Sequence, residues 1–256
     1  MNILPLQKGI LYGPINSRRL GKSLGINLMP TKYKLCSFNC VYCHYGLTDE
    51  LTMNLENYIK DLPEYNDVMK AIEGAVKSPL EFDYITFSGN GEPTLYPNFS
   101  SLVDEVIKIR DKYRPNVKVA LLSNSSGLIY AEVRESIRNI DLPVFKLDAG
   151  RADKFRAINN PIRDVNFEGI VDLLSNLSNI CIQTVLIDGN LFNTSKEDID
   201  SYFEKLKKIQ PKEVHIYSTD RPVPNTEIKR VKPDRLKEIA REGEKETGVR
   251  IKAFYL

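Results

Sequence analysis

Short apolar segments alternate with longer amphipathic ones along most of the chain, and this alternation limits the possible fold more than any other feature. Short apolar segments of this kind are typical of buried strands, and the one at 180–187 is rich in β-branched residues. They lie at residues 23–28, 82–87, 117–122, 143–147, 180–187 and 213–218, and a terminal strand is expected at 249–255. Helical spacing of apolar residues occurs at 98–112, 128–139, 165–177, 195–209 and 233–246.

Strands that alternate with helices predict βαβ units and a parallel sheet. Six such strands joined by right-handed crossovers would curl into a partial (βα)6 parallel barrel, an α/β fold. We therefore expect one domain over residues 1–256, with a basic N-terminal segment at 1–22 and a helix and strand extension at 223–256. Ligands of such folds bind at the carboxyl ends of the strands, so polar residues there are the first candidates for a functional site.

Charge and hydropathy exclude several classes of protein. Lysine and arginine outnumber aspartate and glutamate by 36 to 34, and a net charge of +2 does not by itself argue for nucleic-acid binding. No apolar run reaches the roughly 18 residues of a membrane-spanning helix. The N-terminus lacks the apolar stretch and cleavage site of a signal peptide. The sequence predicts a cytoplasmic protein without a membrane anchor, in a compartment where thiols stay reduced.

Three of the four cysteines lie within eight residues, in a loop after the first predicted strand. These are Cys36, Cys40 and Cys43, whereas Cys181 lies alone inside a predicted strand and is expected to be an inert core thiol. Three thiols in one loop suit metal ligation better than a disulfide framework. A four-iron cluster normally takes four cysteines, so three would leave one iron open to another ligand, as in catalytic metal sites. A zinc site that adds His44 is the alternative.

Glycines and polar residues follow the later strands. Gly89-Asn90-Gly91-Glu92 comes after the second strand, where glycines let the backbone approach a ligand and Glu92 can accept a hydrogen bond from an ammonium group. An ordinary Gly/Pro turn explains the same residues. Ser123 and Asn124 follow the third strand, as a ligand contact or as a helix cap.

The fourth strand ends in two charged residues that share one face. Lys146 and Asp148 alternate with apolar neighbours, so both side chains point to the same side of the sheet. They are candidates either for a ligand site or for an ion pair with each other. Farther along, Gln183 needs a partner inside its strand, Arg221 is a candidate anion ligand or structural ion-pair partner, and His215 is expected to be packed.

The spacing Cys36-x3-Cys40-x2-Cys43, with Tyr42 before the last cysteine, resembles the signature of the radical S-adenosylmethionine (SAM) superfamily. Gly89-Asn90-Gly91-Glu92-Pro93 resembles that superfamily's Gly-Gly-Glu-Pro motif, and the likeness extends over nearly the whole chain. It implies that the cysteines hold a [4Fe–4S] cluster whose open iron binds SAM. It also implies that an electron, from a donor such as ferredoxin or flavodoxin, cleaves SAM to a 5′-deoxyadenosyl radical that abstracts hydrogen from a substrate.

The same resemblance implies a set of SAM-binding residues and leaves further catalytic residues undefined. Glu92 would receive the amino group of SAM, and the residues after the third strand would meet its ribose or methionine part. The full set is Tyr42, Gly89, Asn90, Gly91, Glu92, Ser123, Asn124 and Asp148.

The N-terminal segment narrows the resemblance. Tyr-Gly-Pro followed by Ser-Arg-Arg-Leu-Gly at residues 12–21, together with Gln-Thr-Val-Leu at 183–186, resembles a radical SAM group related to the wyosine-base synthases, which modify tRNA. Archaeal wyosine enzymes carry a second cluster on extra N-terminal cysteines, and this chain has none before Cys36. The substrate stays open between RNA and a protein or peptide. A non-catalytic iron–sulfur protein is the third alternative.

The basic residues of this segment have two interpretations. With Lys32 and Lys34, the arginines and lysine of residues 18–22 would form a positive patch beside the cysteine loop. Such a patch suits a phosphate or another acidic group. A solvated loop is the alternative.

Overall fold

The computed structural model describes residues 3–255. The chain divides into two compact units. The first unit comprises Leu6–Ser37 and Thr48–Pro143, and the second comprises Met1–Pro5, Phe38–Leu47 and Val144–Leu256. The cysteine loop therefore contributes to both units, because its first cysteine belongs to one and the other two belong to the other.

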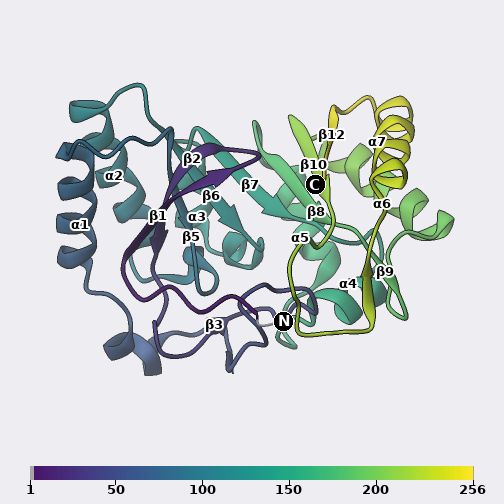
Figure 1. Cartoon of the computed structure of the whole chain (residues 1–256), viewed down its shortest axis with the longest axis horizontal. Helices are drawn as coiled ribbons and strands as arrows, with labels where there is room; N and C mark the ends of the chain where they lie inside the picture. Colours follow the sequence, from purple (N-terminus) through teal and green to yellow (C-terminus); the bar gives the residue numbers. More distant parts are fainter. Residues whose placement is uncertain (1–2, 256) are drawn as a thin grey trace. The chain divides into compact units, whose positions relative to one another are not determined.

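Four strands of the first unit lie side by side (Figure 1). Their order is β1 (Leu11–Ser17), β2 (Gly21–Asn27), β5 (Tyr84–Ser88) and β6 (Lys118–Ser123). β2, β5 and β6 are mutually parallel, which confirms the three strands predicted here, and β1 pairs antiparallel with β2. The sequence gives little sign of β1, because its glycine, proline and serine are poor strand formers whose pairing depends on β2.

Helices α1 (Tyr65–Lys77), α2 (Phe99–Tyr113) and α3 (Ala131–Ile137) pack in succession in this unit. Short 3₁₀ turns occur at Glu56–Asp61, Pro93–Leu95 and Ser126–Ile129. The helix predicted from residue 128 therefore begins later, at Ala131. Apolar residues on one face of α1 and α2 are buried, and Phe99 of α2 meets Phe87 of β5 edge-on, with ring centroids 5.3 Å apart. Burial of this apolar face is the main driving force for packing the helices.

Four strands of the second unit form a parallel sheet. Their order is β7 (Leu142–Lys146, from Val144 on in this unit), β8 (Cys181–Val185), β10 (Glu213–Tyr217) and β12 (Ile251–Phe254). Each matches a predicted strand. The predicted strand at 180–187 is divided, because β9 (Ile187–Gly189) leaves β8 and pairs antiparallel with β11 (Ile228–Arg230).

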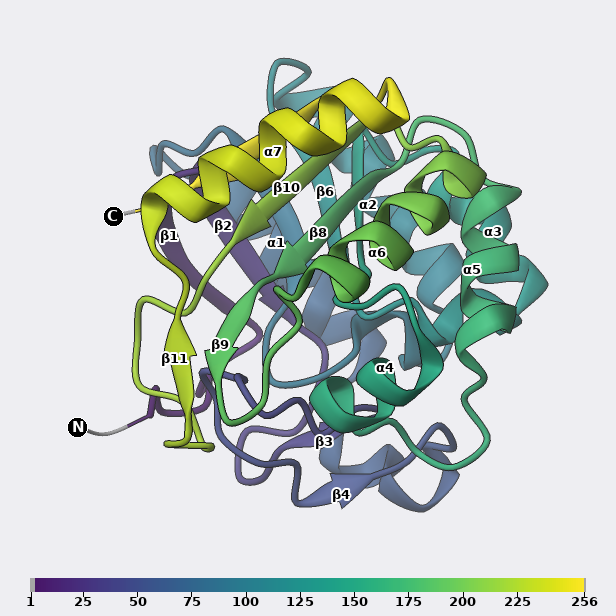
Figure 2. The same ribbon diagram turned by 90° about the vertical axis from the view of Figure 1, so that its right-hand side faces the viewer.

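Four helices complete the second unit: α4 (Ala152–Asn159), α5 (Phe167–Ser175), α6 (Lys196–Ile209) and α7 (Pro233–Thr247). Ser195 caps α6 by accepting a hydrogen bond from the Asp198 amide at 3.2 Å. Figure 2 shows α6 and α7 lying across the strands β8 and β10. Their apolar faces bury Phe203, Leu206 and Ile239.

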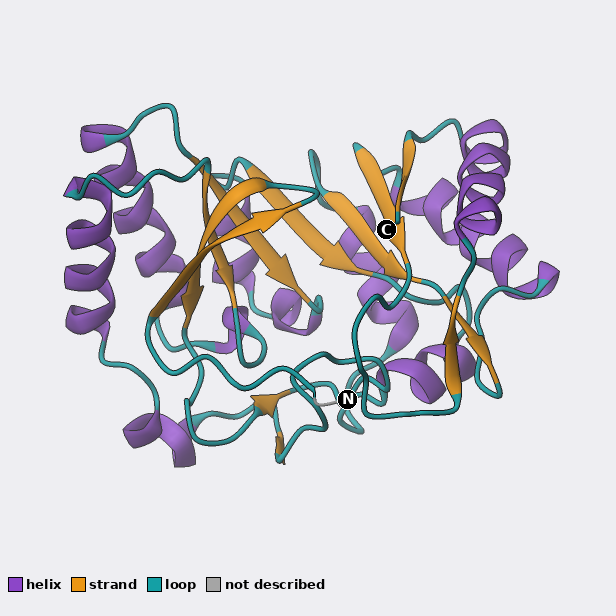
Figure 3. Cartoon of the chain, in the orientation of Figure 1, coloured by secondary structure: helices purple, strands orange, loops and turns teal. Residues whose placement is uncertain are grey.

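Two short strands hold the start of the cysteine loop. β3 (Leu35–Cys36) pairs in parallel with β4 (Glu50–Leu51), and both lie in the first unit. Much of the remaining chain around them is loop (Figure 3). Over residues 3–255, none of the helices combines the length and the apolar character needed to cross a membrane.

Candidate active site

Cys36 is fixed by its backbone and by its side chain. Cys36 is buried, and its backbone carbonyl accepts a hydrogen bond from the Thr52 amide at 3.0 Å. The side-chain amide of Asn124, at the end of β6, donates to Cys36 Sγ at 3.6 Å and to Ser37 Oγ at 2.9 Å. A predicted SAM-binding residue and a predicted cluster ligand of the first unit are therefore in direct contact.

Glu92 joins the ends of β5 and β6. Its Oε1 accepts hydrogen bonds from Thr94 N at 3.1 Å, Thr94 Oγ1 at 2.5 Å and Ser123 Oγ at 2.8 Å. Its Oε2 accepts one from Asn124 N at 2.6 Å. The structure thus brings together three of the predicted SAM-binding residues, with the buried carboxylate of Glu92 at their centre.

The pKa of Glu92 is raised above its ordinary value of 4.5, because burial penalises the carboxylate more than its hydrogen bonds stabilise it. The folded state therefore binds the proton more tightly than the unfolded state, and this contribution to stability is lost as the pH rises through the raised pKa. We expect the difference between the unfolding free energies of the wild type and Glu92→Gln to fall as the pH rises above 4.5, the ordinary pKa of this carboxyl group. Urea denaturation of both proteins at several pH values measures it, and a difference that grows with pH would contradict the assignment.

Asn90 holds the N-terminal segment against the loop after β5. Its side chain exchanges two hydrogen bonds with the Gln7 backbone, at 2.7 and 2.9 Å, and also donates to the Pro30 carbonyl at 2.9 Å. Both of its amide protons are thereby used. Its own backbone N–H donates to Asn27 Oδ1 at 3.0 Å. Asn90 therefore shapes the glycine loop through its side chain.

The two glycines of this loop permit close approaches that a side chain would block. Gly89 has a φ of +121°, and a Cβ there would lie 2.6 Å from Asn27 Oδ1. A Cβ on Gly91 would lie 1.8 Å from the carbonyl oxygen of Leu35, the residue before Cys36. The glycine loop and the start of the cysteine loop can pack together only because position 91 has no side chain.

We expect Gly91→Ala to destabilise the protein by at least about 1–3 kcal/mol, the range for overpacking in a filled interior. It should also lower iron loading, since the displaced Leu35 precedes Cys36. Gly74→Ala is the matched control, because a Cβ at this position in α1 meets nothing within 4 Å. It should stabilise the helix by about 0.5–1 kcal/mol. Urea denaturation and iron analysis of both variants test the contrast, which equal stabilities would contradict.

In the second unit, Cys40, Tyr42 and Asp148 meet around Asn159. The Tyr42 hydroxyl donates to Asp148 Oδ2, and Val185 N donates to Asp148 Oδ1 at 2.7 Å. The side-chain amide of Asn159 lies 2.6 Å from Asp148 Oδ2, 3.1 Å from Tyr42 Oη and 3.5 Å from Cys40 Sγ. Two predicted SAM-binding residues and a predicted cluster ligand are joined by one network.

Sequence reasoning missed Asn159. It is the last residue of α4, and Asn160 after it adopts a left-handed conformation with φ of 39°. An Asn-Asn-Pro sequence is a recognisable helix end, so the sequence could have placed the residue at a terminus. Its contact with Cys40 arises from tertiary packing and has no sequence signal.

Lys146 lies beside this network. Its Nζ is 4.0 Å from Asp148 Oδ2 and 5.0 Å from the centroid of the Tyr42 ring. Burial raises the pKa of the Tyr42 phenol well above its usual range, so the hydroxyl stays protonated and donates. The pairing of Lys146 with Asp148 is long, and Asp148 accepts shorter hydrogen bonds from Tyr42, Asn159 and Val185 N.

The other ionisable groups of the cysteine loop respond to burial. Burial raises the pKa of the Cys40 thiol to about 11, so a bound metal would have to displace its proton. Burial lowers the pKa of His44, and the positive charges of Arg221 and Lys146 lower it further. The loop that contains Arg221 also contacts the cysteine loop, since Asn225 N donates to Val41 O at 3.2 Å.

The donor set fits an iron–sulfur cluster. Cys36 and Cys40 are buried, and each of these two thiols accepts a hydrogen bond from a side-chain amide. Hydrogen bonds to the sulfurs are common around iron–sulfur clusters. Among residues 3–255, no three His, Cys, Asp or Glu side chains converge as they would around one metal ion. A cubane takes one thiolate at each corner, so its ligands need not converge on one point. The assignment of Cys36, Cys40 and Cys43 stays a prediction.

Three further candidates are buried or paired with a neighbouring side chain. Cys181 is buried in β8, and burial raises its pKa to about 11. His215 is packed in β10, where its Nε2 lies 2.5 Å from Glu213 Oε1. In the basic segment, Lys22 pairs with Glu81 at 2.9 Å, and both side chains are exposed.

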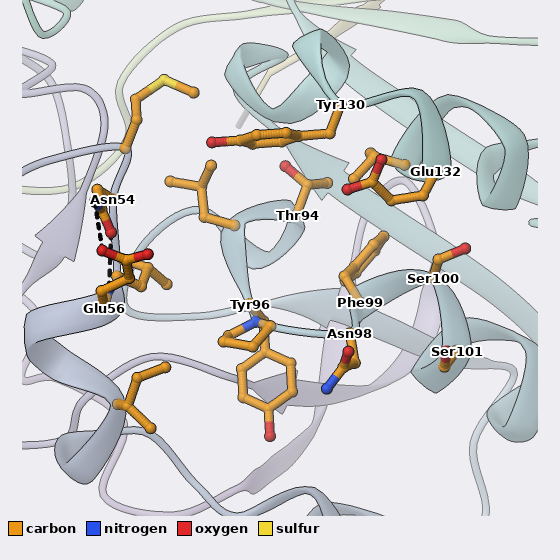
Figure 4. A pocket seen from close by; sticks show the side chains of 16 residues that line it. Asn54, Glu56, Thr94, Tyr96, Asn98, Phe99, Ser100, Ser101, Tyr130 and Glu132 are labelled. Atoms are coloured by element: carbon orange, nitrogen blue, oxygen red, sulfur yellow. Dashed lines mark hydrogen bonds between the residues drawn. The ribbon is translucent and has the colours of Figure 1, made fainter.

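A cavity of about 720 Å³ opens in the first unit near the start of α2. Figure 4 shows Thr94, Tyr130 and Glu132 directed into it. Thr94 belongs to this cavity and to the Glu92 network, because its hydroxyl donates to Glu92 Oε1. The charged residues of its lining, Glu56 and Glu132, are both acidic, so the cavity does not suit a phosphate.

Comparison with known sequences identifies relatives over most of the chain. Residues 31–206 match the family described as the Radical SAM superfamily. The chain is 34% identical over 238 residues to the UPF0026 protein MJ1312 of Methanocaldococcus jannaschii, covering 91% of this chain and 69% of that protein. It is 28% identical over 177 residues to the S-adenosyl-L-methionine-dependent tRNA 4-demethylwyosine synthase of the same organism, covering 60% and 53%.

A further relative is much longer. The chain is 32% identical over 222 residues to the "GTPase Obg" of Brachyspira hyodysenteriae, which covers 86% of this chain and 31% of that protein. The chain thus spans about a third of the length of that relative.

Solved structures share the fold. TYW1 with a lysine-pyruvate adduct has a TM-score of 0.58 at 19% identity, covering 89% of this chain and 75% of that one. Streptococcus suis SuiB bound to S-adenosylmethionine has a TM-score of 0.63 at 14% identity, covering 87% and 49%. The likeness confirms the predicted α/β fold of radical SAM type, a partial barrel with a parallel sheet.

Proposed function

Because the chain belongs to the radical SAM superfamily, we propose that it is an enzyme in which Cys36, Cys40 and Cys43 ligate a [4Fe–4S] cluster beside bound SAM. Membership of this superfamily carries both cofactors. When bound, they supply the one-electron cleavage of SAM to methionine and a 5′-deoxyadenosyl radical, which abstracts a hydrogen atom from the substrate. The electron comes from a small reductant protein such as ferredoxin or flavodoxin.

In the first unit, Glu92 is the proposed acceptor for the ammonium group of SAM. Among the described residues its Oε2 accepts a single hydrogen bond, from Asn124 N, so a second lone pair is available. A bond from an ammonium to a carboxylate is charge-assisted and strong. Gly89 and Gly91 are proposed to contact SAM through their backbone; their loop packs closely on Asn27 and Leu35, and Asn90 holds it in place. Ser123 and Asn124 are the proposed contacts to the rest of SAM.

In the second unit, the Tyr42 hydroxyl and the Asp148 carboxylate orient each other. The phenol stays protonated because burial raises its pKa, so the carboxylate remains the acceptor. Val185 N and Asn159 hold the same carboxylate from two other directions. This hydrogen-bonded group is the proposed wall of the SAM site next to Cys40.

One observation supports this assignment above the rest. In each unit, a thiol of the loop is hydrogen-bonded to the polar network that contains the predicted SAM-binding residues: Cys36 through Asn124, and Cys40 through Asn159. A chance group of buried thiols does not require asparagine side chains as partners. A non-catalytic iron–sulfur protein does not require the Glu92 network.

The test is anaerobic reconstitution with iron and sulfide, followed by reduction with dithionite in the presence of SAM. We expect about four irons per chain, as a [4Fe–4S] cluster requires, and formation of 5′-deoxyadenosine. A protein that holds a cluster without cleaving SAM would support the alternative of a non-catalytic iron–sulfur protein. Zinc in place of iron would refute the proposal.

We propose tRNA as the substrate class. The relative described as a tRNA 4-demethylwyosine synthase supports this choice, as does the turn between β1 and β2, where Arg18 is exposed. Phosphate contacts make RNA affinity depend strongly on salt. We expect tRNA to be retained during purification at low salt and lost at high salt, and 5′-deoxyadenosine formation to rise when tRNA is added. Stimulation by a protein or peptide instead would replace tRNA with that substrate.

A further inference from the structure

Two buried asparagines each direct an amide N–H at the sulfur of a loop cysteine. In the first unit Asn124 Nδ2 lies 3.6 Å from Cys36 Sγ, and in the second Asn159 Nδ2 lies 3.5 Å from Cys40 Sγ. The sequence predicts a SAM contact for Asn124 and no role for Asn159. Because the same contact occurs at two thiols, the role of Asn159 needs an explanation.

The neighbours of Asn159 fix which end of its amide faces the sulfur. Its Nδ2 is 2.6 Å from Asp148 Oδ2, and a carboxylate accepts hydrogen bonds, so the NH₂ group must lie on this side. One N–H is directed at Asp148. The other is directed toward Cys40 Sγ, with Tyr42 Oη at 3.1 Å. The sulfur therefore faces a proton of the amide.

The opposite end of the same amide is unsatisfied. Among the described residues, Asn159 Oδ1 is buried and has no hydrogen-bond partner. An unpaired buried acceptor is unfavourable, and a leucine of similar size would avoid it. The contacts of its nitrogen with Asp148 and Cys40 account for an asparagine at this position.

We propose that Asn159 is a positioning residue that raises the reduction potential of the cluster by donating a hydrogen bond to the Cys40 sulfur. The inference rests on the proposed function, since it requires Cys40 to be a cluster ligand. Reduction adds one electron, and part of the added negative charge resides on the ligating sulfurs. An N–H donor stabilises that charge and so favours the reduced state. Asn124 acts in the same way on Cys36.

The test is an EPR-monitored redox titration of the reconstituted protein without SAM. We expect Asn159→Leu to lower the ratio of reduced to oxidised cluster about tenfold at a fixed solution potential, which is 59 mV for a one-electron couple. Tyr42→Phe is the matched control. It removes a hydroxyl from the same network but leaves the amide beside the sulfur, so its shift should be clearly smaller. Equal shifts, or none in Asn159→Leu, would overturn the inference.

A second measurement does not depend on a variant that folds. Wild-type protein produced with ¹⁵N-asparagine should show a weak ¹⁵N coupling to the reduced cluster in pulsed EPR, and its absence would overturn the inference. The two hypotheses fail separately. A wild type that assembles no four-iron cluster, or does not cleave SAM, refutes the proposed function. A wild type that cleaves SAM but shows no ¹⁵N coupling refutes only the role of the asparagines.

Discussion

Cys40→Ala should abolish the cluster and reduce 5′-deoxyadenosine formation by more than about 100-fold. Changes in residues that merely support metal ligands typically cost 10- to 100-fold, and loss of a ligand costs more. With Cys40 absent, two thiols remain in the loop, which is too few to hold a cubane. The variant should still fold. Because burial raises the pKa of the Cys40 thiol, the thiol is uncharged in the apo protein, and a small apolar alanine can replace it. Iron and sulfide analysis, visible absorption and the SAM-cleavage assay measure these effects.

Cys181→Ala is the matched control for this experiment. Cys181 is also buried, and burial raises its pKa to about 11, as for Cys40, but it lies inside β8 and outside the cysteine loop. We expect this variant to keep full iron content and SAM cleavage. Normal SAM cleavage by Cys40→Ala would refute the ligand assignment. Loss of the cluster in both variants would show that buried thiols matter only for folding.

Most of the fold was predictable because its strands and helices bury continuous apolar faces. The strands β5, β6 and β10 have strong periodic signals and are found where the pattern places them. β1 was not predictable, since its glycine and proline signal turns and its pairing comes from β2. Helix α1, between the cysteine loop and β5, is absent from the predicted helices, although its buried Val68, Ile72 and Val76 repeat at helical spacing.

Most residues of the candidate site were predictable from the sequence, whereas many of the hydrogen bonds between them were not. Strand ends of a parallel sheet gather polar residues at one edge, and so Glu92, Ser123 and Asn124 come together as the pattern predicts. The sequence does not indicate that the side chain of Asn90 is used by Gln7 and Pro30. Nor does it indicate Asn159, because a helix-ending asparagine looks the same whether or not a thiol is nearby.

Asp148→Ala should lower the unfolding free energy by about 3–5 kcal/mol. The carboxylate is buried and accepts hydrogen bonds from Tyr42, Asn159 and Val185 N. Removing it leaves three buried donors without an acceptor, with Lys146 nearby at 4.0 Å. Because Tyr42 and Asn159 also adjoin Cys40, the variant should load less iron. Urea denaturation of the apo protein and iron analysis after reconstitution measure the two effects.

Asp148→Asn removes the charge of this side chain but keeps its shape. Its amide keeps one oxygen for the Val185 N–H but turns an NH₂ group toward the NH₂ of Asn159, so we expect a smaller loss of about 1–3 kcal/mol. Asp200→Ala is the surface control: Asp200 pairs with Lys196 on an exposed face of α6, and its removal should leave the unfolding free energy unchanged. If Asp148→Ala unfolds at the same urea concentration as Asp200→Ala, the network does not hold the second unit together. The hydrogen bonds of Asp148 would then be too weak to position Tyr42 or Asn159 beside Cys40.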